Sequence, residues 1–128
     1  MNEALNDETR MAELNEATFD REVLNSEIPV LVDFYAPWCG PCRMLAPALA
    51  ALSRDFEGRV KFVKVNVDQA PALAQAYEIT GVPTLMFFRH SEVVDTVVGL
   101  ESLRSLKARL EQLARLTTKP SGPFATAA

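Results

Sequence analysis

The only two cysteines of the chain lie three positions apart, where an apolar run of residues changes into a helical pattern. Residues 29–36 are rich in β-branched side chains and have the length of a buried strand. From residue 39 to residue 56 the apolar residues recur at helical spacing. Cβ atoms at positions i and i+3 of a helix lie about 5–6 Å apart, so Cys39 and Cys42 can close a disulfide with a small adjustment of the first turn. The sequence therefore predicts a strand, a tight turn and a helix that begins at a cysteine pair.

This junction also predicts redox chemistry. Unpaired N–H groups and the positive end of the helix dipole favour a thiolate at Cys39, and a thiolate is the nucleophile that attacks disulfides. The pair is interpreted as a dithiol–disulfide exchanger, with two inert cysteines or half of a metal site as the alternatives. Because His90 is the only histidine, one chain cannot supply a closed zinc site, although a site shared by two chains stays open. We expect no metal.

Size and charge narrow the class of protein further. The chain has 128 residues, enough for one domain with a substantial core, and a formal net charge of −4. This charge argues against nucleic acid or an anionic membrane as a partner. The N-terminal residues include no apolar stretch of the length of a secretory signal, and no apolar segment of the chain has the length of a membrane span. We therefore expect a cytoplasmic protein, with a periplasmic or organellar form, already trimmed of its targeting segment, as the alternative.

The hydrophobic pattern predicts strands alternating with helices. The expected strands are residues 11–15, 29–36, 60–67, 84–89 and 92–98, and the expected helices are residues 16–25, 39–56, 68–77 and 100–116. A right-handed parallel crossover in the first half and a hairpin at His90 in the second indicate a mixed sheet with helices on both faces. Asp68 is expected to cap the third helix, and Leu100 and Leu103 are expected on the inward face of the last.

Several of these residues occur in a familiar order. The run VDFYAPWCGPC at residues 32–42 is followed by Pro47, which should kink the helix, and by GVPT at residues 81–84. In this order they closely resemble the thioredoxin family over about residues 11–116. The resemblance implies an α/β thioredoxin fold, with a central mixed sheet of about five strands flanked by about four helices. The domain is expected at residues 11–117, between a flexible acidic extension at 1–10 and a disordered tail at 118–128.

The resemblance also implies roles for residues around the cysteines. Cys39 would be the partly exposed nucleophile and Cys42 the shielded resolving thiol, the two forming the redox disulfide. Asp33 stands within a strand expected to be buried, which should raise its pKa. The family places this carboxyl group beneath the second cysteine, as a general base that deprotonates Cys42 through a water. The alternatives are a structural hydrogen-bonding role for Asp33, or pairing with Lys64, which could itself be a plain solvated lysine.

A substrate-binding rim is implied next to Cys39. Pro83 would follow a cis peptide bond and present the backbone of Val82 to an extended substrate segment, and its alternative role is to open a strand. The remaining rim residues would be small or apolar: Trp38, Gly40, Pro41 and Gly99. Trp38 could instead fill the core.

We therefore expect this chain to be a reductase of protein disulfides that binds no cofactor of its own. Its partners would be disulfide-bearing client proteins and, as for relatives, an NADPH-dependent flavoprotein, thioredoxin reductase. We expect a monomer. A disulfide oxidase or isomerase on the same fold remains an alternative, as does a chaperone or complex subunit that does not use its cysteines.

Overall fold

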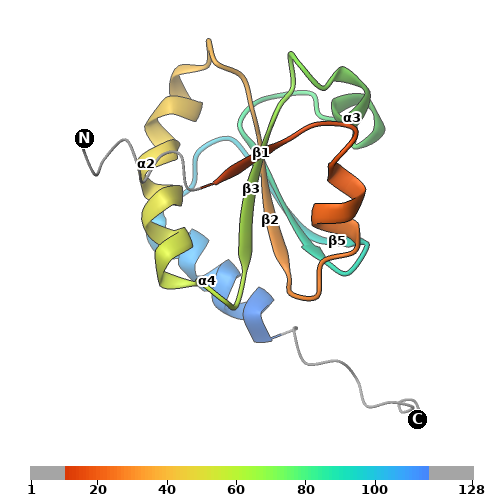
Figure 1. The fold of residues 1–128 in the computed structure, drawn as a ribbon. Coiled ribbons are helices and arrows are strands. Elements are labelled where there is room, and N and C mark those ends of the chain that lie inside the picture. Colours follow the sequence, from red (N-terminus) through yellow and green to blue (C-terminus); the bar gives the residue numbers. More distant parts are fainter. Residues whose placement is uncertain (1–10, 116–128) are drawn as a thin grey trace, which may run out of the picture.

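Residues 11–115 are described by a computed structural model, in which five strands form one mixed sheet (Figure 1). The strands are β1 (Ala12–Leu14), β2 (Val30–Tyr35), β3 (Lys61–Asn66), β4 (Thr84–Arg89) and β5 (Glu92–Val98). Their order is β1-β3-β2-β4-β5, with β1, β3 and β2 parallel and with β4 antiparallel to both β2 and β5. The predicted mixed sheet is confirmed. The segments predicted at 1–10 and 118–128 lie outside the described residues.

Helices cover both faces of this sheet. Helices α2 (Gly40–Asp55) and α4 (Leu103–Arg115) lie on one face, while α3 (Pro71–Ala76) and the five-residue helix η1 (Asp20–Leu24) lie on the other (Figure 1). Two hydrophobic cores result, one beneath each pair of helices. The arrangement agrees with the α/β thioredoxin fold that the sequence predicts.

The central strand β2 divides its side chains between the two cores. Leu31 enters the core beneath α2 and α4, while Val30, Val32 and Phe34 enter the core beneath η1 and α3. Successive side chains of a strand point to opposite faces, so Asp33 shares the face of Leu31. The strand thereby places a carboxyl group beneath α2, close to the end of the sheet where that helix begins.

Three predicted helices differ from the structure at their starts, and two of them are the first and the last. The helix expected from residue 16 is a turn followed by η1, and the side chain of Asn15 accepts hydrogen bonds from the N–H groups of Ala17 and Thr18 at 2.9 and 3.1 Å. A side chain that accepts from the second and third N–H groups after it caps a helical turn, and the carbonyl oxygen of Asn15 also accepts a hydrogen bond of 3.0 Å from the N–H of Phe19, so Asn15 caps the turn that leads into η1. The last helix begins at Leu103, not at Leu100, and both leucines are exposed. The prediction that they face the core is therefore wrong.

The predicted cap of α3 is also wrong. The helix begins after Ala70, and no side chain of its own N-cap residue accepts a hydrogen bond there. Instead the carboxylate of Glu16, distant in sequence, accepts a hydrogen bond of 2.9 Å from the N–H of Ala72 in the first turn. Asp68 binds a different partner, described below.

The hairpin between β4 and β5 turns at His90 as predicted. His90 has a φ of +60°, a left-handed conformation that a non-glycine residue adopts only at some cost.

Among residues 11–115, no helix has the length and apolar character that crossing a membrane requires.

Candidate active site

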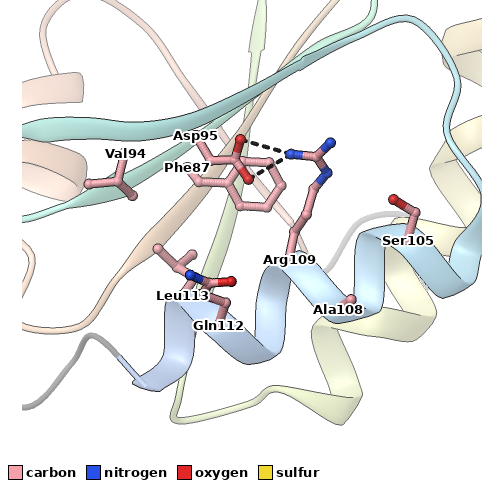
Figure 2. A pocket seen from close by; sticks show the side chains of 8 residues that line it. All are labelled: Phe87, Val94, Asp95, Ser105, Ala108, Arg109, Gln112 and Leu113. Atoms are coloured by element: carbon pink, nitrogen blue, oxygen red, sulfur yellow. Dashed lines mark hydrogen bonds and ion pairs between the residues drawn. The ribbon is translucent and has the colours of Figure 1, made fainter.

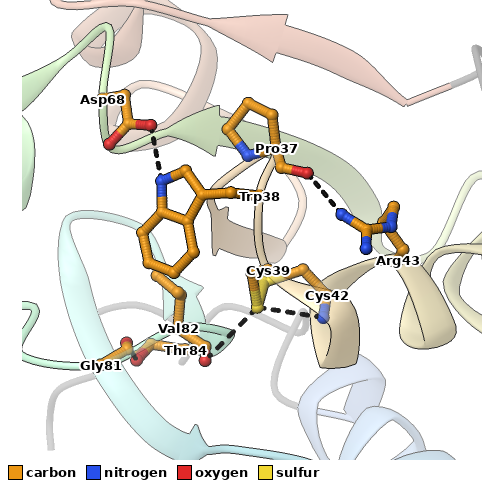
Figure 3. The surroundings of a disulfide bond; sticks show 9 residues. All are labelled: Pro37, Trp38, Cys39, Cys42, Arg43, Asp68, Gly81, Val82 and Thr84. Atoms are coloured by element: carbon orange, nitrogen blue, oxygen red, sulfur yellow. Dashed lines mark hydrogen bonds between the residues drawn. A yellow bond between two sulfur atoms is a disulfide. The ribbon is translucent and has the colours of Figure 1, made fainter.

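Cys39 and Cys42 form a disulfide at the start of α2 (Figure 3). Cys39 is the N-cap residue, with extended backbone angles (φ −88°, ψ 113°), and Gly40 and Pro41 complete the turn into the helix. The Cα atoms of the two cysteines are 5.2 Å apart. Proline suits the first turn of a helix because its missing N–H would have no intrahelical partner there. The predicted strand, turn and helix start at the cysteine pair are therefore present in the structure.

A backbone donor is directed at the first cysteine. The N–H of Cys42 donates to Sγ of Cys39 over 3.2 Å. The Arg43 guanidinium donates a hydrogen bond of 2.7 Å to the carbonyl oxygen of Pro37. This bond ties the first turn of α2 to the loop that precedes it. Together these contacts form a fixed N-terminal helix end around one sulfur atom, where a negative charge would be stabilised.

Both sulfur-bearing residues are buried in this disulfide form. Cys39 is 4% exposed and Cys42 is 5% exposed, so the expectation that Cys39 is partly exposed is wrong for this state. They pack with Ala36 and Val82, and the carbonyl oxygen of Val82 lies 3.7 Å from Sγ of Cys39. The backbone of Val82 therefore lies directly against the sulfur atom of Cys39.

Trp38 lies on the surface beside the disulfide. Its residue exposure is 68%, which excludes the alternative that it fills the core. The indole N–H donates a hydrogen bond of 2.9 Å to the carboxylate of Asp68, which follows β3 (Figure 3). Asp68 was missed as a site residue, because only the packing of two distant loops brings it to the indole.

The residues expected around Cys39 come from three separate segments. The Val82–Pro83 peptide bond is cis, as the resemblance predicts. The N–H of Gly99 donates a hydrogen bond of 2.8 Å to the carbonyl oxygen of Pro83, and Gly99 has a φ of +87° that favours glycine. Pro83 is buried, whereas Val82 and Gly99 are half-buried. The fold therefore brings Val82, Pro83 and Gly99 together, in the segments that flank β4 and β5.

Asp33 lies behind the disulfide, in the interior. Burial raises the pKa of its carboxyl group to about 7, and the nearby charge of Lys64 lowers it by a smaller amount. Its Oδ1 atom is buried without a hydrogen-bond partner. Asp33 and Cys42 line the same cavity of about 110 Å³, together with Lys64 and Tyr35. A buried polar atom facing a small cavity is a place where a water molecule can bind.

Lys64 is the register partner of Asp33 in the parallel pair β2–β3, and it is also the partner of Glu13 in β1–β3. Its ammonium group lies 5.6 Å from the ring centre of Tyr35, whose hydroxyl donates to the carboxylate of Glu13. Lys64 thus stands between two carboxyl groups on neighbouring strands. Glu13 and Tyr35 were missed as neighbours of this site, because their contact depends on strand register.

The described residues contain no group of three or more histidine, cysteine, aspartate or glutamate side chains that could hold a metal ion. The chemistry available at the site is that of the two sulfur atoms, the buried carboxyl group and the backbone around them.

Comparison with known proteins agrees with this geometry. The family model named Thioredoxin matches residues 10–112, which is most of the chain. The chain belongs to the thioredoxin family. "Thioredoxin 1" of Synechococcus elongatus is 50% identical over 101 residues, 79% of this chain and 94% of that protein. "Thioredoxin 1" of Nostoc sp. is 48% identical over the same shares. "Thioredoxin M-type, chloroplastic" of Pisum sativum is 42% identical over 99 residues, 77% of this chain and 58% of that protein.

Family membership and the disulfide together establish the reaction. This member of the thioredoxin family is a protein-disulfide reductase, which exchanges a dithiol for a disulfide through Cys39 and Cys42. Disulfide-bearing client proteins are accordingly its partners.

Proposed function

We propose that Cys39 is the attacking thiol and Cys42 the resolving thiol of this reductase. The Cys39 thiolate attacks one sulfur of a client disulfide, forming a mixed disulfide and releasing the other client sulfur as a thiolate. The Cys42 thiolate then attacks Sγ of Cys39, forming the internal disulfide and releasing the second client thiol. The client gains two electrons, and the cysteine pair loses them. The N–H of Cys42 directed at Sγ of Cys39 is the observation that supports this order.

Asp33 acts in the second half of this cycle. Its carboxylate accepts the proton of Cys42 through a water molecule in the shared cavity, so that Cys42 becomes a nucleophile when the mixed disulfide has formed. A raised pKa near 7 suits a group that must both accept and release a proton at neutral pH. Lys64 adjusts this pKa by its charge from the neighbouring strand.

The client polypeptide binds along the rim formed by Trp38, Gly40, Pro41, Val82, Pro83 and Gly99. An extended segment pairs with the backbone of Val82 as an added strand, which brings a client sulfur toward Cys39. The exposed ring of Trp38 covers one side of this segment.

The remaining partners follow from the same reaction. Thioredoxin reductase, an NADPH-dependent flavoprotein, restores the dithiol, and the chain works as a monomer whose functional unit is residues 11–117. A reducing compartment such as the cytoplasm suits this cycle, because catalytic thiols are kept reduced there.

Insulin reduction with NADPH and thioredoxin reductase tests this proposal. We expect turnover by the wild-type chain, none by Cys39→Ser, and about a hundredfold slower resolution of the mixed disulfide by Asp33→Asn, the low side of what general-base catalysis contributes. A redox potential close to those of disulfide oxidants, with no insulin reduction, would overturn the proposed direction of electron flow.

A further inference from the structure

A charged cluster includes a residue of the short connection that follows Gly99, a member of the proposed rim. It joins three elements: Asp95 in β5, Glu101 in the connection after Gly99, and Arg109 in α4. The Arg109 guanidinium donates to both carboxylate oxygens of Asp95, each at 2.8 Å (Figure 2). Its Nε–H donates to the carboxylate of Glu101 at 2.6 Å.

Glu101 is held from two sides. Besides Arg109, the hydroxyl of Ser105 donates to the same oxygen of Glu101. These contacts lower the pKa of Glu101, the hydrogen bond from Ser105 contributing most, and raise that of Arg109. The three charged side chains are between 21% and 36% exposed, so water screens their ion pairs less than it would fully exposed ones.

Glu101 lies two positions after Gly99, a residue of the proposed rim. Gly99, whose N–H bonds to the carbonyl oxygen of Pro83, is separated from Glu101 only by the exposed Leu100. This short connection between β5 and α4 therefore has one end fixed by the cis-proline segment and the other by Arg109. The sequence pattern would instead continue α4 back to Leu100, and the observed helix begins only at Leu103.

We propose that Arg109 is a positioning residue for client binding, which holds residues 99–101 against the Val82–Pro83 segment through Glu101. The inference rests on the proposed role of Gly99 in the rim. The ion-pair partners of Arg109 are Glu101 and Asp95, so we assign Arg109 no part in the chemistry of the sulfur atoms. Its loss loosens one wall of the rim, so it slows reaction with a folded or extended polypeptide but not with a small disulfide that needs no rim.

The test compares two disulfides in single-turnover oxidation of the fully reduced chain, followed by the fluorescence of Trp38, the only tryptophan. For Arg109→Met and Glu101→Gln, we expect the rate constant with insulin to fall about threefold to tenfold, as for other substitutions remote from a site. The rate constant with 2-hydroxyethyl disulfide should stay the same. The double variant should be no slower than the slower single variant, because both single variants already remove the ion pair between Arg109 and Glu101.

Glu111→Gln provides the matched control. Glu111 also lies in α4, but its ion pair is with Arg59, at 3.4 Å. It should leave both rate constants unchanged. If Glu111→Gln slows insulin as much as Arg109→Met does, or if both disulfides slow in parallel, general loosening of α4 explains the data and the proposal fails.

Hydrogen exchange of the Gly99 amide separates this inference from the rim on which it rests. Faster exchange in Arg109→Met and Glu101→Gln, together with slower insulin reaction, supports the proposal. Unchanged exchange means that Arg109 does not hold the connection, and it overturns the inference alone. If exchange is faster but the rate constant with insulin is unchanged, Gly99 plays no part in client binding. This result overturns both the role of Gly99 in the rim and the inference that rests on it.

Discussion

Asp33 and Cys42 face the same small cavity, one from the central strand β2 and the other from the first turn of α2. The two sulfur atoms therefore have different chemical surroundings. Sγ of Cys39 receives a backbone N–H and lies against the carbonyl oxygen of Val82, while Cys42 lines a cavity with a buried carboxyl group. Each cysteine therefore has a partner suited to a different step of disulfide exchange.

Removing the resolving thiol should trap the intermediate. Cys42→Ser keeps the attacking Cys39 but lacks the sulfur that releases the client, so covalent complexes with client proteins should accumulate. The measurement is non-reducing electrophoresis with mass spectrometry of the linked cysteine. Cys39→Ser is the control and should form few such complexes. Trapping mainly through Cys42 would mean that the two roles are reversed.

Asp33→Asn should stabilise the oxidised protein at high pH. The folded-state pKa of about 7 lies above the ordinary value of 3.8, so the native state keeps a proton that the unfolded state has already released. The unfolding free energy of the wild type therefore falls as pH rises from about 4 to 7. The variant does not lose this free energy, so above pH 7 it should be more stable than the wild type by up to about 4 kcal/mol.

Urea unfolding of the oxidised wild type and of Asp33→Asn, at pH 4 and pH 8, measures this gain. The difference in unfolding free energy should be small at pH 4 and large at pH 8. An equal difference at both pH values would show that Asp33 ionises normally in the folded protein.

Lys64→Met should raise the pKa of Asp33 further. The charge of Lys64 is the influence that opposes burial at this carboxyl group, and methionine has a side chain of similar length without the charge. Titration of the Asp33 carboxyl carbon by NMR measures the effect in the oxidised protein. Lys61→Met is the control, since Lys61 lies on the same strand but pairs with Glu22 at 2.6 Å. A lower or unchanged pKa in Lys64→Met would remove Lys64 from the account of the site.

Much of the site could be predicted because its residues are close in sequence or belong to a recognisable order. Cys39, Gly40, Pro41 and Cys42 form one helix start, which the change from strand to helix spacing marks directly. The burial of Asp33 followed from its place in an apolar strand. The cis bond before Pro83 followed from the resemblance alone, because few X-Pro bonds are cis.

The contacts that could not be predicted depend on tertiary packing. Asp68 has the sequence features of a helix cap, but the position of Trp38 gives it another partner. The proximity of Glu13 to Lys64 requires the register of β1 against β3. Leu100 fits an inward helical face, yet the left-handed turn at Gly99 keeps it outside the helix. Hydrophobic periodicity contains no information about such turns and pairings.

We infer that the helix start makes Cys39 the thiol that ionises first. Cysteine-selective NMR of the fully reduced protein, recorded between pH 5 and pH 11, follows both thiols separately. We expect Cys39 to lose its proton well below the value of about 8.5 that is typical of free cysteine, and Cys42 to lose its proton above it. Cys42→Ala keeps the backbone N–H at position 42 and should leave the early ionisation of Cys39 in place. Ionisation of both thiols at or above the free-cysteine value, or of Cys42 before Cys39, would contradict the account.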